Sequence, residues 1–358
     1  SEEKSFNRGW TVDTDTGAAS ATGRAGVGCP ASILGAASGY NCTSLYNPDP
    51  GDPWDGSITP SSTYTKNKTR TISAYVFDTI GLSDQFDLNL GIRLDSYKIR
   101  SESTGGRGGP FSGESNSTFV NYQAGIVYKP TPYGSIYANF ATSSDPSGLT
   151  AGEGSENLSA DNVDLDPEES RSYEVGTKWD LFDNNLSLTA AAFRTDKRNT
   201  RVDDGTGVTV LGGKQRVQGF EVGVAGNITE EWAIFGGYTY LDSKIVDDGA
   251  GTDDGNRLPN VPKHSIGLWT TYDVLPEVTV GTGMTYNSKR YANTANDFEI
   301  PGYVRVDAMV SYEYSENVSF RLNALNLTDK RYFDKAHSVH FATVAPGRSV
   351  LLSAAVKF

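Results

Sequence analysis

The chain contains three histidines, His264, His337 and His340, whose side chains could transfer protons or bind a metal ion near neutral pH. His264 stands in VPKHS, at the start of an apolar segment, and there a structural role is favoured. His337 and His340 stand in DKAHSVHF, where solvated loop histidines are the simplest interpretation. No G-x-S-x-G motif accompanies them, so the sequence predicts no hydrolytic catalytic group.

The acidic segment DDGAGTDDGN, residues 247–256, is the other group that could hold a metal ion. Carboxylates are ligands of Ca²⁺, but an EF-hand places them at fixed positions of a loop that ends in Glu. This segment has neither that spacing nor the terminal Glu. A solvated acidic loop is therefore the favoured interpretation, and no metal ligand is assigned.

The two cysteines, Cys29 and Cys42, stand in GCPASILGAASGYNC, a segment rich in Gly, Ala and Ser. No histidine or further cysteine is close enough in the sequence to complete a zinc site. A disulfide formed in an oxidising compartment is therefore favoured over two free thiols. Closing so short a loop would stabilise the fold by about 3 kcal/mol in the chain-entropy description.

The composition limits the class of protein that can position these groups. The 358 residues carry 44 acidic and 31 basic side chains, a formal net charge of −13, and no RNA-binding motif or basic run is present. This charge balance argues against nucleic-acid binding. Hydrophobic residues make up only 37%, and no run approaches the roughly 18 apolar residues of a transmembrane helix. Membrane-spanning β-strands are shorter and only half apolar, so they are compatible with this composition.

Apolar and polar residues alternate in several segments. In RSVLLSAAVKF every second side chain from Val350 to Phe358 is apolar, and YVRVDAMVSYEYSENVSFRLNALNL repeats the pattern in two runs joined by a short turn. Strand side chains point alternately to two faces, so each run predicts a strand with one apolar and one polar face. The pattern fits a soluble sandwich with the apolar face inside, or a membrane barrel with the apolar face toward lipid.

Short turns and long loops alternate along the chain, and this asymmetry favours the barrel. Short turn signals occur at residues 82–85, 130–134, 182–185, 228–231, 274–277 and 314–317. Long connections rich in Gly, Asp, Ser and Pro occur at about 9–61, 102–117, 143–168, 200–208, 244–260, 292–300 and 332–345. Six turns and seven loops predict fourteen strands. Outer-membrane barrels have short turns at one end and long loops at the other, with aromatic residues near the strand ends, whereas a propeller would need repeat signatures that are absent. We therefore predict an all-β, transmembrane, antiparallel β-barrel.

Several segments, taken in order, resemble the TonB-dependent siderophore receptors. DLDPEESRSYEVGTKW resembles the family's strand in which Pro-Glu precedes a yEvG.K pattern, and GKQRVQGFEVG carries its R..G.E pattern. LPNVPKHSIGLWTTYDV matches a P..PkH...lw..Y strand, and AYVFDTIGLSDQFDLNLGIRLDSY resembles an earlier hairpin. NALNLTDKRYFD and PGRSVLLSAAVKF match the end of the family barrel. Together these segments cover nearly everything from residue 68 to residue 358.

Within that family, the cysteine pair in the first long loop is similar to that of Fiu-type catecholate siderophore receptors. The resemblance implies a multi-pass barrel in the outer membrane of a Gram-negative bacterium, which takes up a ferric siderophore, an Fe(III) complex of catecholate character, with energy supplied through TonB. It implies no enzyme activity and no covalently bound cofactor. Outer-membrane lipid, lipopolysaccharide and the barrel-assembly machinery are the further partners implied, with Phe358 as the C-terminal aromatic residue at the membrane boundary.

The chain departs from the family pattern at its N-terminal side. Family members have a 22-stranded barrel filled by an N-terminal plug, which follows a TonB-contacting box. Residues 1–358 contain neither, and their fourteen predicted strands match the last fourteen of the family barrel. We therefore expect residues 1–358 to be the C-terminal portion of the barrel domain. The alternatives are a receptor for another cargo, such as cobalamin, a saccharide or another siderophore, and an unplugged fourteen-strand passive channel.

Ferric catecholates are anionic and aromatic, so the resemblance implies a binding surface of Arg, Lys and aromatic residues in the extracellular loops. We expect a minority of the loop residues of these types to contact ligand. The candidates, with the two loop histidines, are Arg24, Tyr40, Tyr46, Trp54, Arg107, Arg290, Tyr291, Lys335, His337 and His340.

Overall fold

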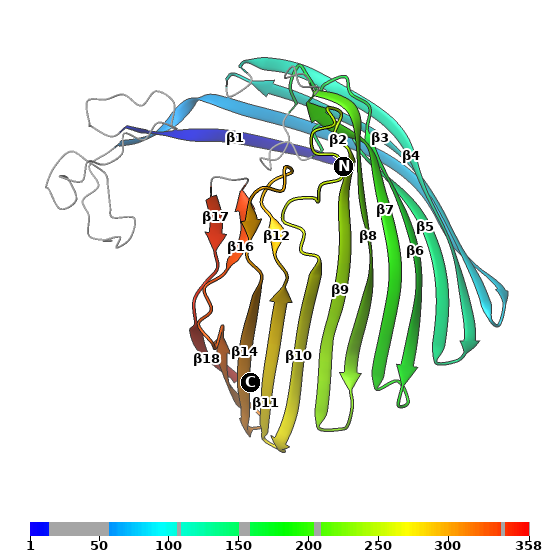
Figure 1. Cartoon of the computed structure of the whole chain (residues 1–358), viewed down its shortest axis with the longest axis vertical. Coiled ribbons are helices and arrows are strands. Elements are labelled where there is room, and N and C mark those ends of the chain that lie inside the picture. The colour runs from blue at the N-terminus through cyan, green and yellow to red at the C-terminus, as the bar shows by residue number, and fades with distance from the viewer. Residues whose placement is uncertain (14–56, 106–108, 150–157, 204–208, 338–340, 358) are drawn as a thin grey trace, which may run out of the picture. The chain divides into compact units, whose positions relative to one another are not determined.

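The computed structural model describes residues 1–13, 57–105, 109–149, 158–203, 209–337 and 341–357. Its regular elements are all β-strands, and fourteen of them form one sheet in which sequential neighbours pair (Figure 1). Four shorter strands form two separate hairpins. Over the same residues, no helix is long and apolar enough to cross a membrane.

The strands of the large sheet follow the order of the chain. In that order they are β1 (Glu2–Asp13), β2 (Ser57–Ser83), β3 (Phe86–Ser103), β4 (Phe111–Thr131), β5 (Gly134–Asp145), β6 (Glu168–Leu181), β7 (Leu186–Asp203), β8 (Thr209–Asn227), β9 (Trp232–Asp247), β10 (His264–Leu275), β11 (Val278–Asn287), β14 (Tyr303–Ser315), β15 (Val318–Leu325) and β18 (Ser349–Val356). The two hairpins are β12 (Arg290–Tyr291) with β13 (Glu299–Ile300), and β16 (Phe333–His337) with β17 (Phe341–Val344).

The fourteen-strand prediction is confirmed, and each short turn predicted from the sequence joins two neighbouring strands. At the turn 182–185, for example, Phe182, Asp183 and Asn184 all have positive φ angles, which Asn and Asp tolerate better than most residues. The loops differ more from expectation. Two connections that the sequence suggests are irregular contain the hairpins β12–β13 and β16–β17, and β3 and β4 extend into the predicted loop at 102–117.

The burial of side chains on β14 shows which face of the sheet is which. Val304 and Val310 are 43% and 44% exposed, whereas Asp307 and Ser311 are only 6% and 7% exposed. A soluble sandwich would bury the apolar residues instead. Exposed apolar side chains opposite a buried polar face are the arrangement of a membrane barrel.

The apolar face continues across neighbouring strands in register. Val280 pairs with Val310, Val310 with Leu322, and Leu322 with Leu352, so that one row of side chains crosses β11, β14, β15 and β18. These four side chains are between 38% and 68% exposed. The alternation read from residues 303–327 and 348–358 therefore corresponds to one continuous apolar surface.

Aromatic side chains border this apolar face at two levels. Trp179 and Trp232 lie at the ends of β6 and β9 that adjoin short turns, and Tyr173, Phe220 and Tyr240 lie nearer the long loops. Phe220 and Tyr240 stack with ring centroids 5.5 Å apart. Tyr173 and Trp179 are six positions apart along β6, and Trp232 and Tyr240 are eight positions apart along β9. At about 3.3 Å per residue, the two levels are roughly 20–26 Å apart along the strands, as expected for the aromatic girdles of a membrane barrel.

The chain divides into two compact units. The first consists of Ser1–Ile72, Tyr97–Asn116 and Ser147–Asp164, and includes β1 and the parts of β2 to β4 that adjoin long loops. Ile99, Tyr97 and Leu158 are buried there, and the Tyr97 hydroxyl donates to the carbonyl of Gly148 at 3.1 Å. The second unit consists of Ser73–Ser96, Ser117–Pro146 and Leu165–Phe358. The structural features that we consider as functional sites all lie in the second unit.

Candidate functional site

Three long connections of the second unit fold against one another. We call their described residues, within 248–263, 288–302 and 326–348, the loop assembly. They join β9 to β10, β11 to β14, and β15 to β18, and they carry the hairpins β12–β13 and β16–β17 (Figure 1). Ala292, Ile300 and Ala336 form a small buried core, against which Phe333 and Ala342 pack. The loops are therefore folded structures with an apolar centre.

Asn260 connects all three parts of the loop assembly. Its backbone N–H donates to the carbonyl of Tyr291 at 2.8 Å. Its side chain forms a reciprocal pair with the backbone of Ala336, donating from Nδ2 to the carbonyl at 3.0 Å and accepting the N–H at Oδ1 at 2.9 Å. Its φ angle is 59°, in the left-handed region that Asn adopts more readily than most residues.

Asn296 makes a second reciprocal pair, between the first two connections. Its Oδ1 accepts the N–H of Arg257 at 2.8 Å, and its Nδ2 donates to the carbonyl of Arg257 at 2.9 Å. Asn296 also has a positive φ angle, of 60°. Asparagine therefore supplies both the turn conformation and the bonds between loops at two separate points.

Arg290, a predicted ligand contact, lies inside the loop assembly and is 4% exposed. It donates to the carbonyl of Phe333 at 2.8 Å and to that of Asp334, and so joins β12 to β16. Burial lowers the pKa of Arg290 from its ordinary value, although Tyr303 and Asp334 act in the opposite direction. This geometry favours a role in holding two loops together and does not present the guanidinium to a ligand.

Asn326 attaches the last connection to the polar face of β14, and it is only 2% exposed. Its backbone N–H donates to Oδ1 of Asp307 at 2.8 Å. Its side chain donates to the carbonyls of Lys330 and Pro346 at 3.0 and 3.2 Å and accepts the N–H of Lys330 at 2.8 Å. One buried amide therefore fixes the start and the end of this connection.

The accessible residues of the loop assembly include two predicted candidates. Lys335 is exposed on β16 and Tyr291 is half-buried on β12. Phe298, which is 50% exposed, and the exposed Arg331 are of the same chemical types but were not among the predicted contacts. Their position in loops next to Tyr291 and Lys335 is the sequence signal that identifies them.

The remaining predicted residues cannot be placed in the site. His337 is the last residue of β16, and its backbone pairs with Phe341. The others lie outside the described residues: Arg24, Tyr40, Tyr46, Trp54, Arg107 and His340, together with Cys29, Cys42 and Phe358.

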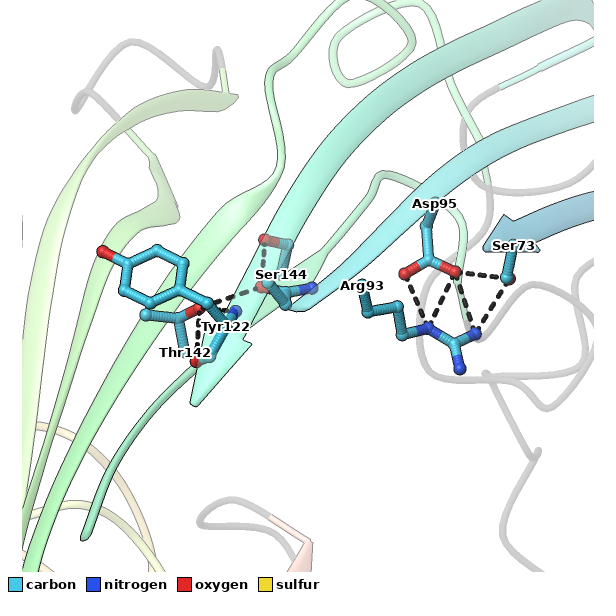
Figure 2. Close-up of polar contacts among 7 residues, drawn as sticks. Ser73, Arg93, Asp95, Tyr122, Thr142 and Ser144 are labelled. Atoms are coloured by element: carbon cyan, nitrogen blue, oxygen red, sulfur yellow. Dashed lines mark hydrogen bonds and ion pairs between the residues drawn. The ribbon is translucent and has the colours of Figure 1, made fainter. Parts of the chain in front are cut away.

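A second group of candidate contacts lies on the polar face of β2 and β3. Arg93 donates from Nε to both carboxylate oxygens of Asp95, at 2.8 and 3.0 Å, and from Nη2 to the hydroxyl oxygen of Ser73 at 2.9 Å (Figure 2). The Arg93 guanidinium lies 6.0 Å from the ring centroid of Tyr75, which is 71% exposed, and Phe77 is 57% exposed. The sequence analysis missed this group, although Ser73, Tyr75 and Phe77 share one face of a strand by alternation.

Figure 2 also shows polar contacts between residues of β4 and β5. The Tyr122 N–H donates to the Thr142 hydroxyl at 3.0 Å, and the Ser144 hydroxyl donates to Asn121 at 3.1 Å. The last residues of the backbone register between these strands are Gln123 and Ala141. Side-chain hydrogen bonds therefore continue the pairing beyond that point.

The acidic segment brings Asp247, Asp248 and Asp254 together, with one carboxylate oxygen of each within 4.8 Å of the others. Asp248 accepts hydrogen bonds at Oδ1 from two backbone N–H groups, and at Oδ2 from the backbone and hydroxyl of Thr252 and the N–H of Asp253. These bonds, of which that from Asp253 has the largest effect, hold the pKa of Asp248 well below its usual range. The carboxylate therefore acts as the organising centre of its own loop.

Comparison with known proteins establishes the family. Residues 2–327 match the family described as TonB dependent receptor-like, beta-barrel. The chain belongs to this family. Barrels of TonB-dependent receptors lie in the outer membrane of Gram-negative bacteria, so the apolar face contacts lipid and the polar face lines the lumen.

Similar proteins include two named siderophore receptors. The chain is 46% identical over 299 residues to the probable TonB-dependent siderophore receptor PiuA of Acinetobacter baumannii, with 80% of this chain and 40% of the relative covered. It is 33% identical over 317 residues to the catecholate siderophore receptor Fiu of Escherichia coli K12, with 81% and 41% covered. The chain therefore spans about 40% of the length of these relatives.

Solved structures of the same two proteins resemble the fold. The crystal structure of PiuA aligns with a TM-score of 0.82 at 43% identity, covering 88% of this chain and 47% of that one. The closed form of the ferric-catecholate import receptor Fiu aligns with a TM-score of 0.78 at 31% identity, covering 88% and 48%. The resemblance identified from the sequence motifs is thus confirmed.

Proposed function

We propose that the chain is the C-terminal portion of the barrel of an outer-membrane receptor that takes up a ferric siderophore, of catecholate type, by a TonB-dependent mechanism. The observation that carries this proposal is the similarity over four fifths of the chain to PiuA and Fiu, whose names state siderophore and catecholate siderophore receptors. Coverage of only 40% and 41% of those relatives supports the view that the plug and the first strands belong to a longer protein.

In this proposal the loop assembly forms part of the cargo site. Its accessible cations, Lys335 and Arg331, would attract an anionic ferric catecholate, and Tyr291 and Phe298 offer aromatic surface for its rings. Arg290 and Asn260 would act indirectly, by holding these loops in one arrangement before the cargo arrives. Such preorganisation lowers the entropic cost of binding.

Transport by this receptor would involve binding and gated passage, with no covalent bond made or broken in the cargo. The Fe(III)–siderophore is cargo, and no covalently bound cofactor or catalytic residue is proposed. TonB would act through the plug that the longer protein provides. Outer-membrane lipid and the barrel-assembly machinery complete the proposed partners, and a Cys29–Cys42 disulfide stays a prediction.

Binding and uptake by the whole receptor test the proposal. We expect a ferric catecholate to quench receptor fluorescence at lower concentration than a ferric hydroxamate or cobalamin, and the double variant Lys335→Ala/Arg331→Ala to weaken binding by about tenfold or more. Uptake, but not binding, should require TonB. If the receptor bound another cargo more tightly, that cargo would replace the ferric catecholate in the proposal. Steady conductance in a planar bilayer without an energy source would favour the passive channel.

A further inference from the structure

A groove of about 560 Å³ lies on the lumen face of β9, β10, β11 and β14, and we call it the lumen groove. Strand alternation and register place its lining on the same face as Asp307 of β14, which is buried on the polar side of the sheet. The lining from β9 and β10 forms three rows. From the short turns toward the loops, the rows are Phe235 with Trp269, Gly237 with Gly267, and Thr239 with Ser265.

The indole of Trp269 lies against the wall because β11 has glycine at two neighbouring positions of this face. A Cβ at Gly283 would lie 2.3 Å from Cε3 of Trp269, and a Cβ at Gly281 would lie 3.0 Å from Cζ2. Any larger residue at Gly283 would therefore push the ring away from the wall. One side of the ring rests on backbone, and the half-buried indole lines the groove with the other.

Phe235, which pairs with Trp269, is an apolar side chain on the polar face of the sheet, and it is 69% exposed. A large exposed aromatic residue in a hollow of the surface indicates contact with a ligand or a partner. The next row toward the loops leaves space above the two rings, because a Cβ at Gly267 would meet no heavy atom within 4 Å. The lumen groove is therefore an open space with an aromatic end.

The charged groups around the lumen groove offset one another. Arg305 donates from Nε and Nη2 to one carboxylate oxygen of Asp307, at 3.1 and 2.8 Å. At the other end, Glu221 of β8 lies beside the row nearest the loops, and Arg257 donates to the carbonyl of Leu241 at 3.4 Å. Two positive and two negative side chains thus balance, so aromatic contact is the main attraction that the groove offers.

The loop end of the lumen groove adjoins the loop assembly. The hydroxyl of Ser265 donates to Oδ1 of Asn287 at 2.8 Å, and the amide of Asn287 donates to the hydroxyl of Tyr303 at 2.8 Å. Tyr303 stacks on Tyr332 of the loop assembly, with ring centroids 4.1 Å apart. The groove therefore continues the lumen wall directly below the loop assembly.

We propose that the lumen groove is a transient second binding station for the cargo, between the loop assembly and the periplasm. The proposal rests on the proposed function, because it takes the cargo to be a ferric catecholate. The catechol rings would stack on the indole of Trp269 and on the ring of Phe235. A transport pathway needs stations that bind strongly enough to be entered and weakly enough to be left, and stacking without net charge meets that requirement.

The test fills the lumen groove in the whole receptor with the variant Gly267→Trp, whose Cβ meets no heavy atom within 4 Å. The probe is a synthetic tris-catecholate loaded with radiolabelled iron. Binding is measured by equilibrium dialysis, and TonB-driven uptake is measured in cells. We expect binding at the loops to stay within about twofold and uptake to fall about tenfold. Unchanged uptake would overturn the proposal.

A second variant, Phe235→Ala/Trp269→Ala, removes the two rings and leaves the groove open. Because the cargo would lose its stacking partners, we expect uptake to fall about fivefold with binding at the loops retained. This variant decides the question if Gly267→Trp does not fold. Uptake equal to that of the unmodified receptor would show that the rings do not contact the cargo.

Asn139→Trp is the matched control, because Asn139 is exposed on the lumen face of β5, away from the lumen groove. It should take up iron like the unmodified receptor, and an equal loss of uptake would show general obstruction of the lumen and overturn the proposal. A rise in passive conductance in Gly267→Trp would show that the groove seats the plug, and would also overturn it. Failure of the unmodified receptor to take up the probe would instead contradict the proposed function, so the two failures are distinguishable.

Discussion

The barrel wall and the loop assembly are stabilised in different ways. In the wall, strands such as β14, β15 and β18 pair through long backbone registers, and their apolar side chains repeat at every second position. In the loop assembly, the backbone pairing is short, with two registered pairs between β12 and β13 and four between β16 and β17. The connections there depend on the side chains of Asn260, Asn296, Arg290 and Asn326.

This difference shows where order in the molecule is redundant and where it is not. A lipid-facing residue of the wall is one of a row of apolar side chains that contact lipid in the same way. The effect of replacing it therefore depends mainly on its depth in the membrane. A loop residue such as Asn260 makes bonds that no neighbour duplicates. Substitutions in the two regions should therefore differ in kind: graded with depth in the wall, and local but abrupt in the loops.

The largest effect is expected in the wall, at Val222. This residue is 47% exposed on the lipid face and lies five residues from the turn-side end of β8, near the middle of the membrane. Val222→Arg should destabilise the folded barrel in vesicles, lowering its free energy of unfolding by about 2–4 kcal/mol, as arginine does at the midplane of other barrels. Gln218→Arg, on the same face but nine residues from that end, should cost less than about 1 kcal/mol. Equal costs in urea titrations would show that depth does not govern the wall.

The next largest effect is expected at Asn326. Asn326→Gly keeps a residue that tolerates the φ angle of 52° but removes three side-chain hydrogen bonds. At about 1 kcal/mol for each bond, the connection 326–348 should open more easily by roughly 2–3 kcal/mol. Amide hydrogen exchange in this connection should accelerate about 30- to 100-fold. The heat-modifiable band of the folded barrel on an SDS gel should not change, because the barrel itself stays folded. Asn317→Gly in an exposed short turn is the control, and acceleration in the wall strands would contradict a local effect.

A smaller effect is expected at Asn260. Asn260→Gly removes the two side-chain bonds to Ala336 and retains the backbone bond to Tyr291. Losing these two bonds should reduce local stability by about 1–2 kcal/mol. The variant should therefore accelerate amide hydrogen exchange more in β16 than in β12. If both hairpins lost protection equally, the loop assembly would behave as one cooperative unit, and the contrast with the wall would be weaker than we infer.

The strands of the wall are predicted well from the sequence because the same pattern of alternation and turns recurs along the chain. Alternation over 303–327 and the six short turns each specify the same strand pattern, so local errors do not change the outcome. The loop hairpins escaped prediction because β12 and β13 have only two residues each and owe their order to contacts distant in sequence. Arg290 illustrates the limit: its residue type suggested a ligand contact, but only the fold shows that its guanidinium bonds to backbone 43 residues away.

The smallest effect concerns the pH dependence of the connection after β9. Hydrogen bonds from the backbone of Asp253, Gly251 and Ala250 and the hydroxyl of Thr252 favour the ionised carboxylate of Asp248 and lower its pKa in the folded state. An acid whose pKa falls on folding stabilises the fold above its ordinary pKa of about 4 and loses that contribution as pH falls through the lowered value. Exchange-corrected protection of residues 248–256 should therefore persist below pH 4 in the unmodified protein.

Asp248→Asn should reduce this protection at every pH. The amide NH2 of Asn is a hydrogen-bond donor, so it would face backbone N–H groups that now donate to the carboxylate of Asp248. Asp253→Asn makes the same change of charge five residues away, and it keeps the backbone N–H that donates to Asp248. It should therefore behave like the unmodified protein. If Asp253→Asn were equally disruptive, the net charge of the acidic segment would control its order, and Asp248 would not be a single-residue anchor like Asn260 and Asn326.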